Sequence, residues 1–361
     1  MITPFNGWQA KVAIQKETTF DAPSSEAVYD VTGKTRFTQS LELLNPGHKV
    51  NVWRMVQTAT NAGQYFRGSI EMELGLNPVV ALILQHFFEV ESATAGGFSL
   101  MGEGGDILGE GGGPIYGEGD SLTNYVLRPP RLQKTSSLKI GLEFPGANVG
   151  LPILGEGDEP ILGEGGGEIL GEGGGSFVFS GAVIDSLVFD VRRNQVPKLL
   201  FNFKAASRSG ALAPVLGSNG QSVTKRRVEH ERCAVTLNSA ALALTEASLS
   251  FAHSKQPARF TNRKPTRFAC GAFSMTGQLA EYLSPDAPLH GAIADQDERS
   301  FYFIANDADG ERKLEVTWPA SQFTGDLPEG IGHTDIVYRA SFNGLENSAR
   351  VDAGPKIVLV V

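Results

Sequence analysis

The chain has 361 residues, of which 41% are hydrophobic and 20% are charged, as expected for a globular protein with one large or two ordinary domains. Its net charge of −9 argues against tight binding of nucleic acid through a basic surface. No apolar run reaches the roughly 18 residues of a membrane helix, the N-terminus lacks the basic and apolar regions of a signal peptide, and two cysteines are too few for a secreted disulfide scaffold. We therefore expect a protein made in a cytosol, with reduced thiols and no membrane partner.

Short runs of alternating apolar residues, separated by Gly, Asp, Ser and Pro, predict a mainly β protein. In the first clear run, residues 69–74, the side chains of Ile70, Met72 and Leu74 share one face. Residues 306–310 carry turn-forming Asn, Asp and Gly between two later runs, so we expect a hairpin turn there. The other expected strands are residues 187–191, 199–204, 301–304, 314–318 and 357–361.

Helix is predicted at two places. Asn77 is a favourable N-cap residue and Pro78 suits the first helical position, so an apolar helix is expected to run from there to Phe88. A second, weaker helix is predicted at residues 278–283.

The order of elements repeats along the chain, which favours a duplication over chance similarity. A strand at residues 37–43, a long polar segment, a strand at residues 66–74 and the Asn77 helix make up the first copy. Residues 244–251, a basic polar stretch, residues 268–275 and the weaker helix make up the second. The predicted boundary lies in the Ser-, Gly-, Ala- and Pro-rich residues 207–221, with domains at residues 1–207 and 208–361.

Two low-complexity tracts, at residues 101–120 and 151–175, repeat a unit close to Ile-Leu-Gly-Glu-Gly-Gly-Gly. Periodic acids among glycines are also found in calcium-binding β-roll repeats, so calcium is one interpretation. The unit is shorter than such repeats and lacks most of their turn aspartates, which favours insertions that pack against each other or against neighbouring subunits. The weak calcium candidates are Glu103, Glu110, Glu118, Glu156, Glu164 and Glu172.

No set of residues points to catalysis, to a cofactor or to a firm metal site. The six histidines show no metal-ligand spacing, and neither His-Glu-x-x-His nor Gly-x-Ser-x-Gly occurs. Residues 230–233 combine His and Cys, but a surface strand explains them better than a ligand pair. We therefore expect a structural protein and not an enzyme.

Three stretches, in order, resemble the major tail tube proteins of tailed bacteriophages. Residues 8–23 form a predicted strand that ends in a Lys-Glu-Thr-Thr-Phe-Asp-Ala-Pro turn, residues 66–88 lead from an amphipathic strand into an apolar helix, and residues 179–189 form a strand that carries Gly181. The resemblance implies two tandem tail-tube-like β-sandwich or partial-barrel domains, each with a flanking helix. The glycine-rich tracts depart from the family pattern and are expected to be insertions.

The resemblance also implies a virion protein, assembled in the host cytoplasm, that polymerises with itself as stacked rings and meets other tail proteins. The rings would form the channel for DNA, which passes without sequence-specific binding. Because the chain is tandem, trimeric rings with pseudo-sixfold symmetry are expected rather than hexamers. Arg67, Ser69, Glu71 and Glu73 are the candidate lining of an acidic lumen, and residues 45–64 suit a hairpin that reaches the next ring.

Two other functions remain open. The chain could be a different virion component, such as a tail terminator, a baseplate component or a decoration protein. It could instead be a calcium-dependent surface adhesin, although the missing signal peptide counts against that alternative.

Overall fold

We describe the fold from a computed structural model of the chain. The described residues are 11–17, 20–21, 28–31, 33–44, 60–96, 101–102, 105–106, 122–130, 137–143, 176–211, 226–258, 264–282, 287–295, 297–325, 337–345 and 355–361. Both glycine-rich tracts lie almost entirely outside these residues. Of the hairpin that is predicted to reach the next ring, residues 45–59 also lie outside them.

The described residues confirm a mainly β protein with only two helices. The strands and helices, in chain order, are β1 (Lys11–Glu17), β2 (Val28–Val31), β3 (Gly33–Leu44), β4 (Thr60–Glu73), α1 (Pro78–Phe87), β5 (Glu89–Gly96), β6 (Met101–Gly102), β7 (Gly105–Asp106), β8 (Leu122–Arg128), β9 (Ser137–Glu143), β10 (Ser176–Arg192), β11 (Lys198–Ala205), β12 (Ser207–Ala211), β13 (Val228–Leu237), β14 (Ala240–Ala241), β15 (Leu244–Ala258), β16 (Arg267–Tyr282), α2 (Pro288–Asp295), β17 (Arg299–Asp307), β18 (Lys313–Gly325), β19 (Val337–Gly344) and β20 (Lys356–Val360).

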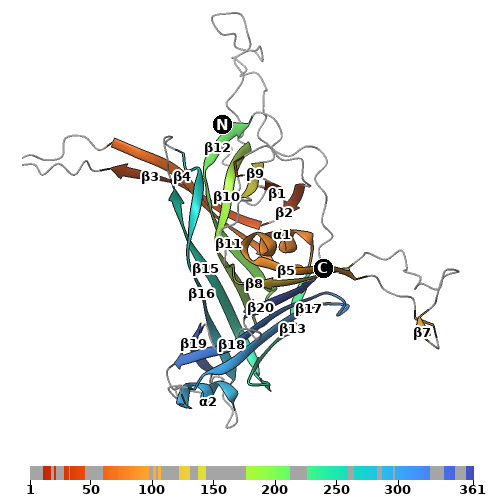
Figure 1. Cartoon of the computed structure of the whole chain (residues 1–361). Coiled ribbons are helices and arrows are strands. Elements are labelled where there is room, and N and C mark those ends of the chain that lie inside the picture. Colours follow the sequence, from red (N-terminus) through yellow and green to blue (C-terminus); the bar gives the residue numbers. More distant parts are fainter. Residues whose placement is uncertain are drawn as a thin grey trace, which may run out of the picture.

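A single antiparallel path of eight strands dominates the molecule, and we call it the long sheet. Its strand order is β3–β4–β11–β10–β15–β16–β19–β18, and every neighbouring pair is antiparallel. The pairing of β10 with β15 joins the two halves of the chain, from Ser186 opposite Ala252 to Arg192 opposite Glu246. In Figure 1 the β3–β4 hairpin projects sideways from the body of this sheet.

Two strands of the long sheet also enter a second layer. The first part of β10 pairs with β9 and β12, and β9 continues to β1 and β2. The first part of β18 pairs with β17 and β20, and β20 continues to β8 and β5. Followed from strand to strand, these described pairings never return to their starting point, so the sheet is not closed into a barrel.

The helix predicted from Asn77 is confirmed. The Asn77 side chain accepts a hydrogen bond from the Val80 N–H at 3.1 Å, and Pro78 occupies the first turn. This helix, α1, lies against β10, and its apolar side chains are buried in the core. Its last residue, Phe87, and the following Phe88 meet Phe251 and Phe273 of the second half in an aromatic cluster, with 5.4 Å between the ring centroids of Phe88 and Phe251.

The predicted helix at residues 278–283 is wrong. Residues 278–282 belong to β16, where Gln278 lies opposite both Ser248 of β15 and Ser341 of β19. Backbone hydrogen bonds to strands on both sides outweigh the local helix preference, and that preference is weak for so short a segment. The second helix, α2, starts at Pro288 and packs against β18 and β19.

The other predicted strands are confirmed, as is the hairpin turn between β17 and β18. Each half contains two long paired strands, then a helix, then another strand pair: β3, β4, α1, β5 and β8 in the first half, and β15, β16, α2, β17 and β18 in the second. The pairing of β20 with β8 links the last strand of the chain to the first half, across the predicted domain boundary. The division into two domains stays a prediction.

Candidate functional site

One face of the long sheet is polar, and it holds all four residues predicted from β4. Ile70 and Met72 are buried on the opposite face, whereas Arg67 and Glu73 are exposed and Ser69 and Glu71 are partly exposed. The ladder places Lys204, Asn202, Leu200 and Lys198 of β11 opposite Arg67, Ser69, Glu71 and Glu73 respectively. Because cross-strand partners share a face, these residues of β4 and β11 form one surface.

Most charges on this polar face are paired. Lys198 lies 2.9 Å from Glu71, and Arg227 lies 2.8 Å from Glu73. Lys204 lies 3.0 Å from Asp185, where β10 bulges. Such half-exposed pairs contribute little to stability, but they neutralise each other locally.

The two halves of the polar face differ in charge. The first half, on β4, β11 and β10, carries both acidic and basic side chains. The second half presents hydroxyl and amide side chains at the corresponding rows of β15, β16 and β19, namely Ser248, Ser250, Thr276, Gln278, Ser341 and Asn343. The second half also carries Glu246 and Arg339, so a more charged half and a less charged half lie side by side across the β10–β15 junction.

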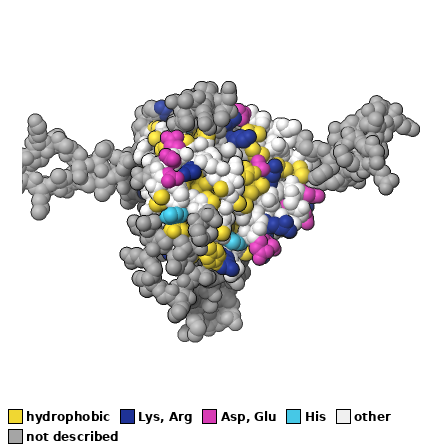
Figure 2. Space-filling model, turned by 90° about the horizontal axis from the view of Figure 1, so that it is seen from below, with side chains coloured by type: hydrophobic (Ala, Val, Ile, Leu, Met, Phe, Trp, Pro, Cys, Tyr) yellow, Lys and Arg dark blue, Asp and Glu magenta, His cyan; other side chains and the backbone are white. Residues whose placement is uncertain are grey.

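The face is balanced in charge rather than acidic, unlike the lumen expected from the net charge of −9. Its described cations are Arg67, Arg192, Lys198, Lys204 and Arg339, and its described anions are Glu71, Glu73, Asp185, Asp190 and Glu246. The lower end of the molecule, seen in Figure 2, likewise carries both acidic and basic side chains. The sequence predicted which β4 residues share a face but not the cations that β10 and β11 bring beside them.

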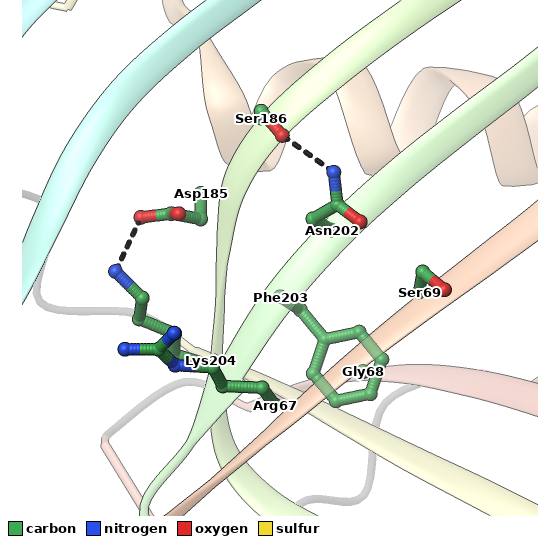
Figure 3. A pocket seen from close by; sticks show the side chains of 8 residues that line it. All are labelled: Arg67, Gly68, Ser69, Asp185, Ser186, Asn202, Phe203 and Lys204. Atoms are coloured by element: carbon green, nitrogen blue, oxygen red, sulfur yellow. Dashed lines mark hydrogen bonds and ion pairs between the residues drawn. The ribbon is translucent and has the colours of Figure 1, made fainter. Parts of the chain in front are cut away.

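The face is hollowed where three of its strands meet. A pocket of about 430 Å³ opens where β4, β11 and β10 meet at the β10 bulge. Figure 3 shows its lining residues, with the Lys204 amine turned to Asp185 and the Asn202 amide turned to Ser186. Arg67 and Ser69, two of the predicted residues, belong to this lining, whereas Glu71 and Glu73 lie beyond it.

A buried carboxylate holds the second layer against the long sheet, and sequence reasoning missed its role. Glu17 is fully buried at the end of β1, where one carboxylate oxygen accepts hydrogen bonds from the Ser137 hydroxyl and from the Gly181 N–H at 3.0 Å. Burial raises the pKa of Glu17, while these two hydrogen bonds partly oppose that shift. Gly181 has a φ of +61°, and a Cβ there would lie 2.9 Å from that of Ala206, so glycine is required.

Neighbouring Asp21 extends this contact. Its side chain accepts hydrogen bonds from the Ser180 hydroxyl at 2.6 Å and from the Ser207 hydroxyl at 2.8 Å. The acids of the 8–23 stretch thus connect β1 with β9, β10 and β12.

The turn between β17 and β18 ties the second half to the start of α1. Arg312 is buried and its guanidinium donates to the Leu76 carbonyl at 3.2 Å, while its backbone N–H donates to Asp307. Arg226 lies 3.3 Å from Asp309 and 3.8 Å from Asp307. Asp307 and Asp309 of this turn therefore both contact arginines.

The calcium candidates Glu103, Glu110, Glu118, Glu156, Glu164 and Glu172 lie outside the described residues. Within the described ranges, no three His, Cys, Asp or Glu side chains are grouped so that they could hold a metal ion.

Residues 230–233 lie in strand β13, as predicted, and burial raises the pKa of Cys233 to about 12. Both Cys233 and Cys270 are free thiols. No helix in the described part of the chain is long and apolar enough to cross a membrane.

A family model described as phage tail tube protein matches residues 7–344, nearly the whole chain. The chain belongs to the phage tail tube protein family. No curated protein matches it.

The family match agrees with the three stretches that carry the resemblance, since residues 8–23, 66–88 and 179–189 all lie inside it. It makes the chain a structural component of a phage tail.

Proposed function

We propose that the chain polymerises as stacked rings into the phage tail tube, with the polar face of the long sheet lining the channel for DNA. The observation that carries this proposal is the open long sheet of a tail tube family member. An extended sheet with free edges is completed by pairing with strands of other copies.

The free edges lie at the two ends of the long sheet. β3 pairs with β4 on one edge, and no described strand pairs with its other edge. At the far end, residues 322–325 of β18 pair with β19, and no described strand pairs with their other edge. A head-to-tail ring would place β3 of one copy beside β18 of the next.

The β10–β15 junction inside the chain serves as a template for that contact. The last part of β10 pairs with β11 on one edge and with β15, the first strand of the second hairpin, on the other. β3 is the first strand of the first hairpin, so it corresponds to β15. In the same way, the last part of β18 corresponds to the last part of β10. The ring contact would then repeat the internal junction, which supports a tandem chain that fills two positions of a pseudo-sixfold ring.

The number of strands fits three copies. Eight strands from each of three chains give 24 in the ring. Strands about 4.8 Å apart and tilted by about 40° then close a barrel about 50 Å across, which is wide enough for a DNA duplex. Six chains would double that width.

The charge pattern suits transit. Acidic and basic side chains, mostly paired, give DNA no continuous basic track, and the hydroxyl- and amide-bearing half adds few charges.

Electron microscopy of the purified protein tests this function. We expect hollow tubes whose averaged cross-section has threefold symmetry with six similar lobes. Tubes in which each ring holds six whole chains would contradict the trimer, and a protein that stays monomeric at high concentration and lacks tubes in virions would contradict the tube assignment.

Charge reversal on β4 tests the lumen. In a Glu71→Lys/Glu73→Lys variant, Lys198 and Arg227 lose their partners and the face gains a continuous basic patch. Tubes should still form, because both positions are at least partly exposed, but DNA ejection should slow several-fold since phosphates are held at every ring. The matched control is Glu229→Lys/Glu231→Lys on β13, outside the long sheet, which should eject DNA at the normal rate. Equal ejection rates for the two variants would show that β4 does not line the lumen.

A further inference from the structure

The pocket at the β10 bulge brings together two cations, Arg67 and Lys204, and one acid, Asp185. Arg67 and Lys204 are directly opposite in the β4–β11 ladder, a position at which like charges repel. Both have turned aside: the guanidinium of Arg67 hydrogen-bonds the Tyr65 hydroxyl, and the Lys204 amine contacts Asp185 and the Lys255 carbonyl. Asp185 is the only acid among the lining residues, so the pocket has a net positive charge.

Neutral hydrogen-bond donors fill the next row. Ser69 is opposite Asn202, and Asn202 is opposite Ser186. The Asn202 amide donates to the Ser186 hydroxyl oxygen at 2.8 Å, so the Ser186 hydroxyl proton remains able to donate elsewhere. In Figure 3 these side chains and the Arg67 and Lys204 head groups surround the same hollow.

The Arg67 guanidinium is held in place by an aromatic ring. Its central carbon lies 5.1 Å from the centroid of the Tyr65 ring, and Tyr65 itself packs against Phe268 of the second half. A fixed guanidinium presents a planar fork of N–H groups that matches the oxygens of a phosphate better than a mobile ammonium does. Two cations, hydroxyl groups and an amide around an open hollow are the donor set of a phosphate site.

We propose that this pocket binds one phosphate of a nucleic-acid backbone. This pocket lies in the charged half of the polar face, while the matching rows of the second half carry uncharged side chains such as Thr276 and Asn343. Three copies in a ring would therefore present three phosphate contacts, separated by three sectors that lack this pair of cations. The identity of the polyanion rests on the proposed function, because only lining of the channel would bring DNA to this face.

The test measures binding of a short DNA duplex to the purified full chain by fluorescence anisotropy across a salt series, with inorganic phosphate as competitor. Arg67→Gln should weaken binding several-fold and reduce the slope of log affinity against log salt by about one phosphate contact. Inorganic phosphate should compete with the duplex for the wild-type chain and less effectively for the variant. The matched control, Arg339→Gln, changes the same charge at an exposed position of β19 outside the pocket and should leave the competition by phosphate unchanged.

Equal losses in Arg67→Gln and Arg339→Gln would show general attraction to the surface and overturn the pocket, as would a wild-type chain that binds neither duplex nor phosphate. Competition by phosphate that depends on Arg67, in a protein that forms no tubes, would support the pocket and reject the proposed function. Tubes of normal symmetry, formed by a protein in which phosphate does not compete with the duplex, would support the proposed function and reject the pocket.

Discussion

Replacing Gln322 and Thr324 with lysine is expected to abolish tube formation while the monomer stays folded. Both side chains are exposed on the last part of β18, on either side of buried Phe323, at the end of the long sheet where no described strand pairs with the outer edge. Lysines on an edge strand are a common means of preventing pairing with another chain. Size-exclusion chromatography should show monomers in place of polymers, and circular dichroism should be unchanged.

The control adds the same two charges to an interior strand. Ser248→Lys/Ser250→Lys places them on the polar face of β15, which is already paired with β10 and β16. This variant should still polymerise. If the β18 variant forms normal tubes, the head-to-tail contact lies elsewhere; if both variants stay monomeric, added charge and not the edge is responsible.

Phe251→Ala is expected to lower the free energy of unfolding by about 3–5 kcal/mol, which is the usual cost of removing a large buried aromatic side chain. Phe251 is fully buried on β15, with its ring centroid 5.4 Å from that of Phe88, 6.0 Å from Phe189 and 6.4 Å from Trp318. It therefore connects the end of α1 and β10 of the first half with β18 of the second. Urea denaturation of the unassembled protein measures the loss.

Phe251→Leu is the matched control, since it retains most of the apolar volume and should cost markedly less. A loss below about 1 kcal/mol for the alanine variant would mean that the cluster is not a shared core. Two separate unfolding transitions in either variant would mean that the halves fold independently of this contact.

Much of the fold could be predicted because its signals are local. Alternation fixed the faces of β4, so the grouping of Arg67, Ser69, Glu71 and Glu73 followed from spacing alone. Asn77 and Pro78 marked the start of α1 because N-caps and first-turn prolines act within a few residues. The β17–β18 turn carried its own signal in Asn, Asp and Gly.

The errors and omissions concern contacts between distant segments. Residues 278–282 form a strand because β15 and β19 pair with both of their edges, which no short window can show. Glu17 meets Ser137 and Gly181, which lie 120 and 164 residues away, so its burial could not be inferred from its own neighbourhood. The cations that balance the polar face come from β10 and β11, and net charge alone suggested an acidic surface.

The β10–β15 junction would favour nucleation of the proposed ring. Six separate domains would have to meet to close a sixfold ring, whereas the proposed trimeric ring of tandem chains, which carry this junction internally, needs only three molecules. Covalent linkage replaces half of the encounters by intramolecular ones at high effective concentration, so less translational and rotational freedom is lost on closure. Ring formation should then depend on protein concentration with a reaction order near three, and a dilute cytoplasm would still support nucleation.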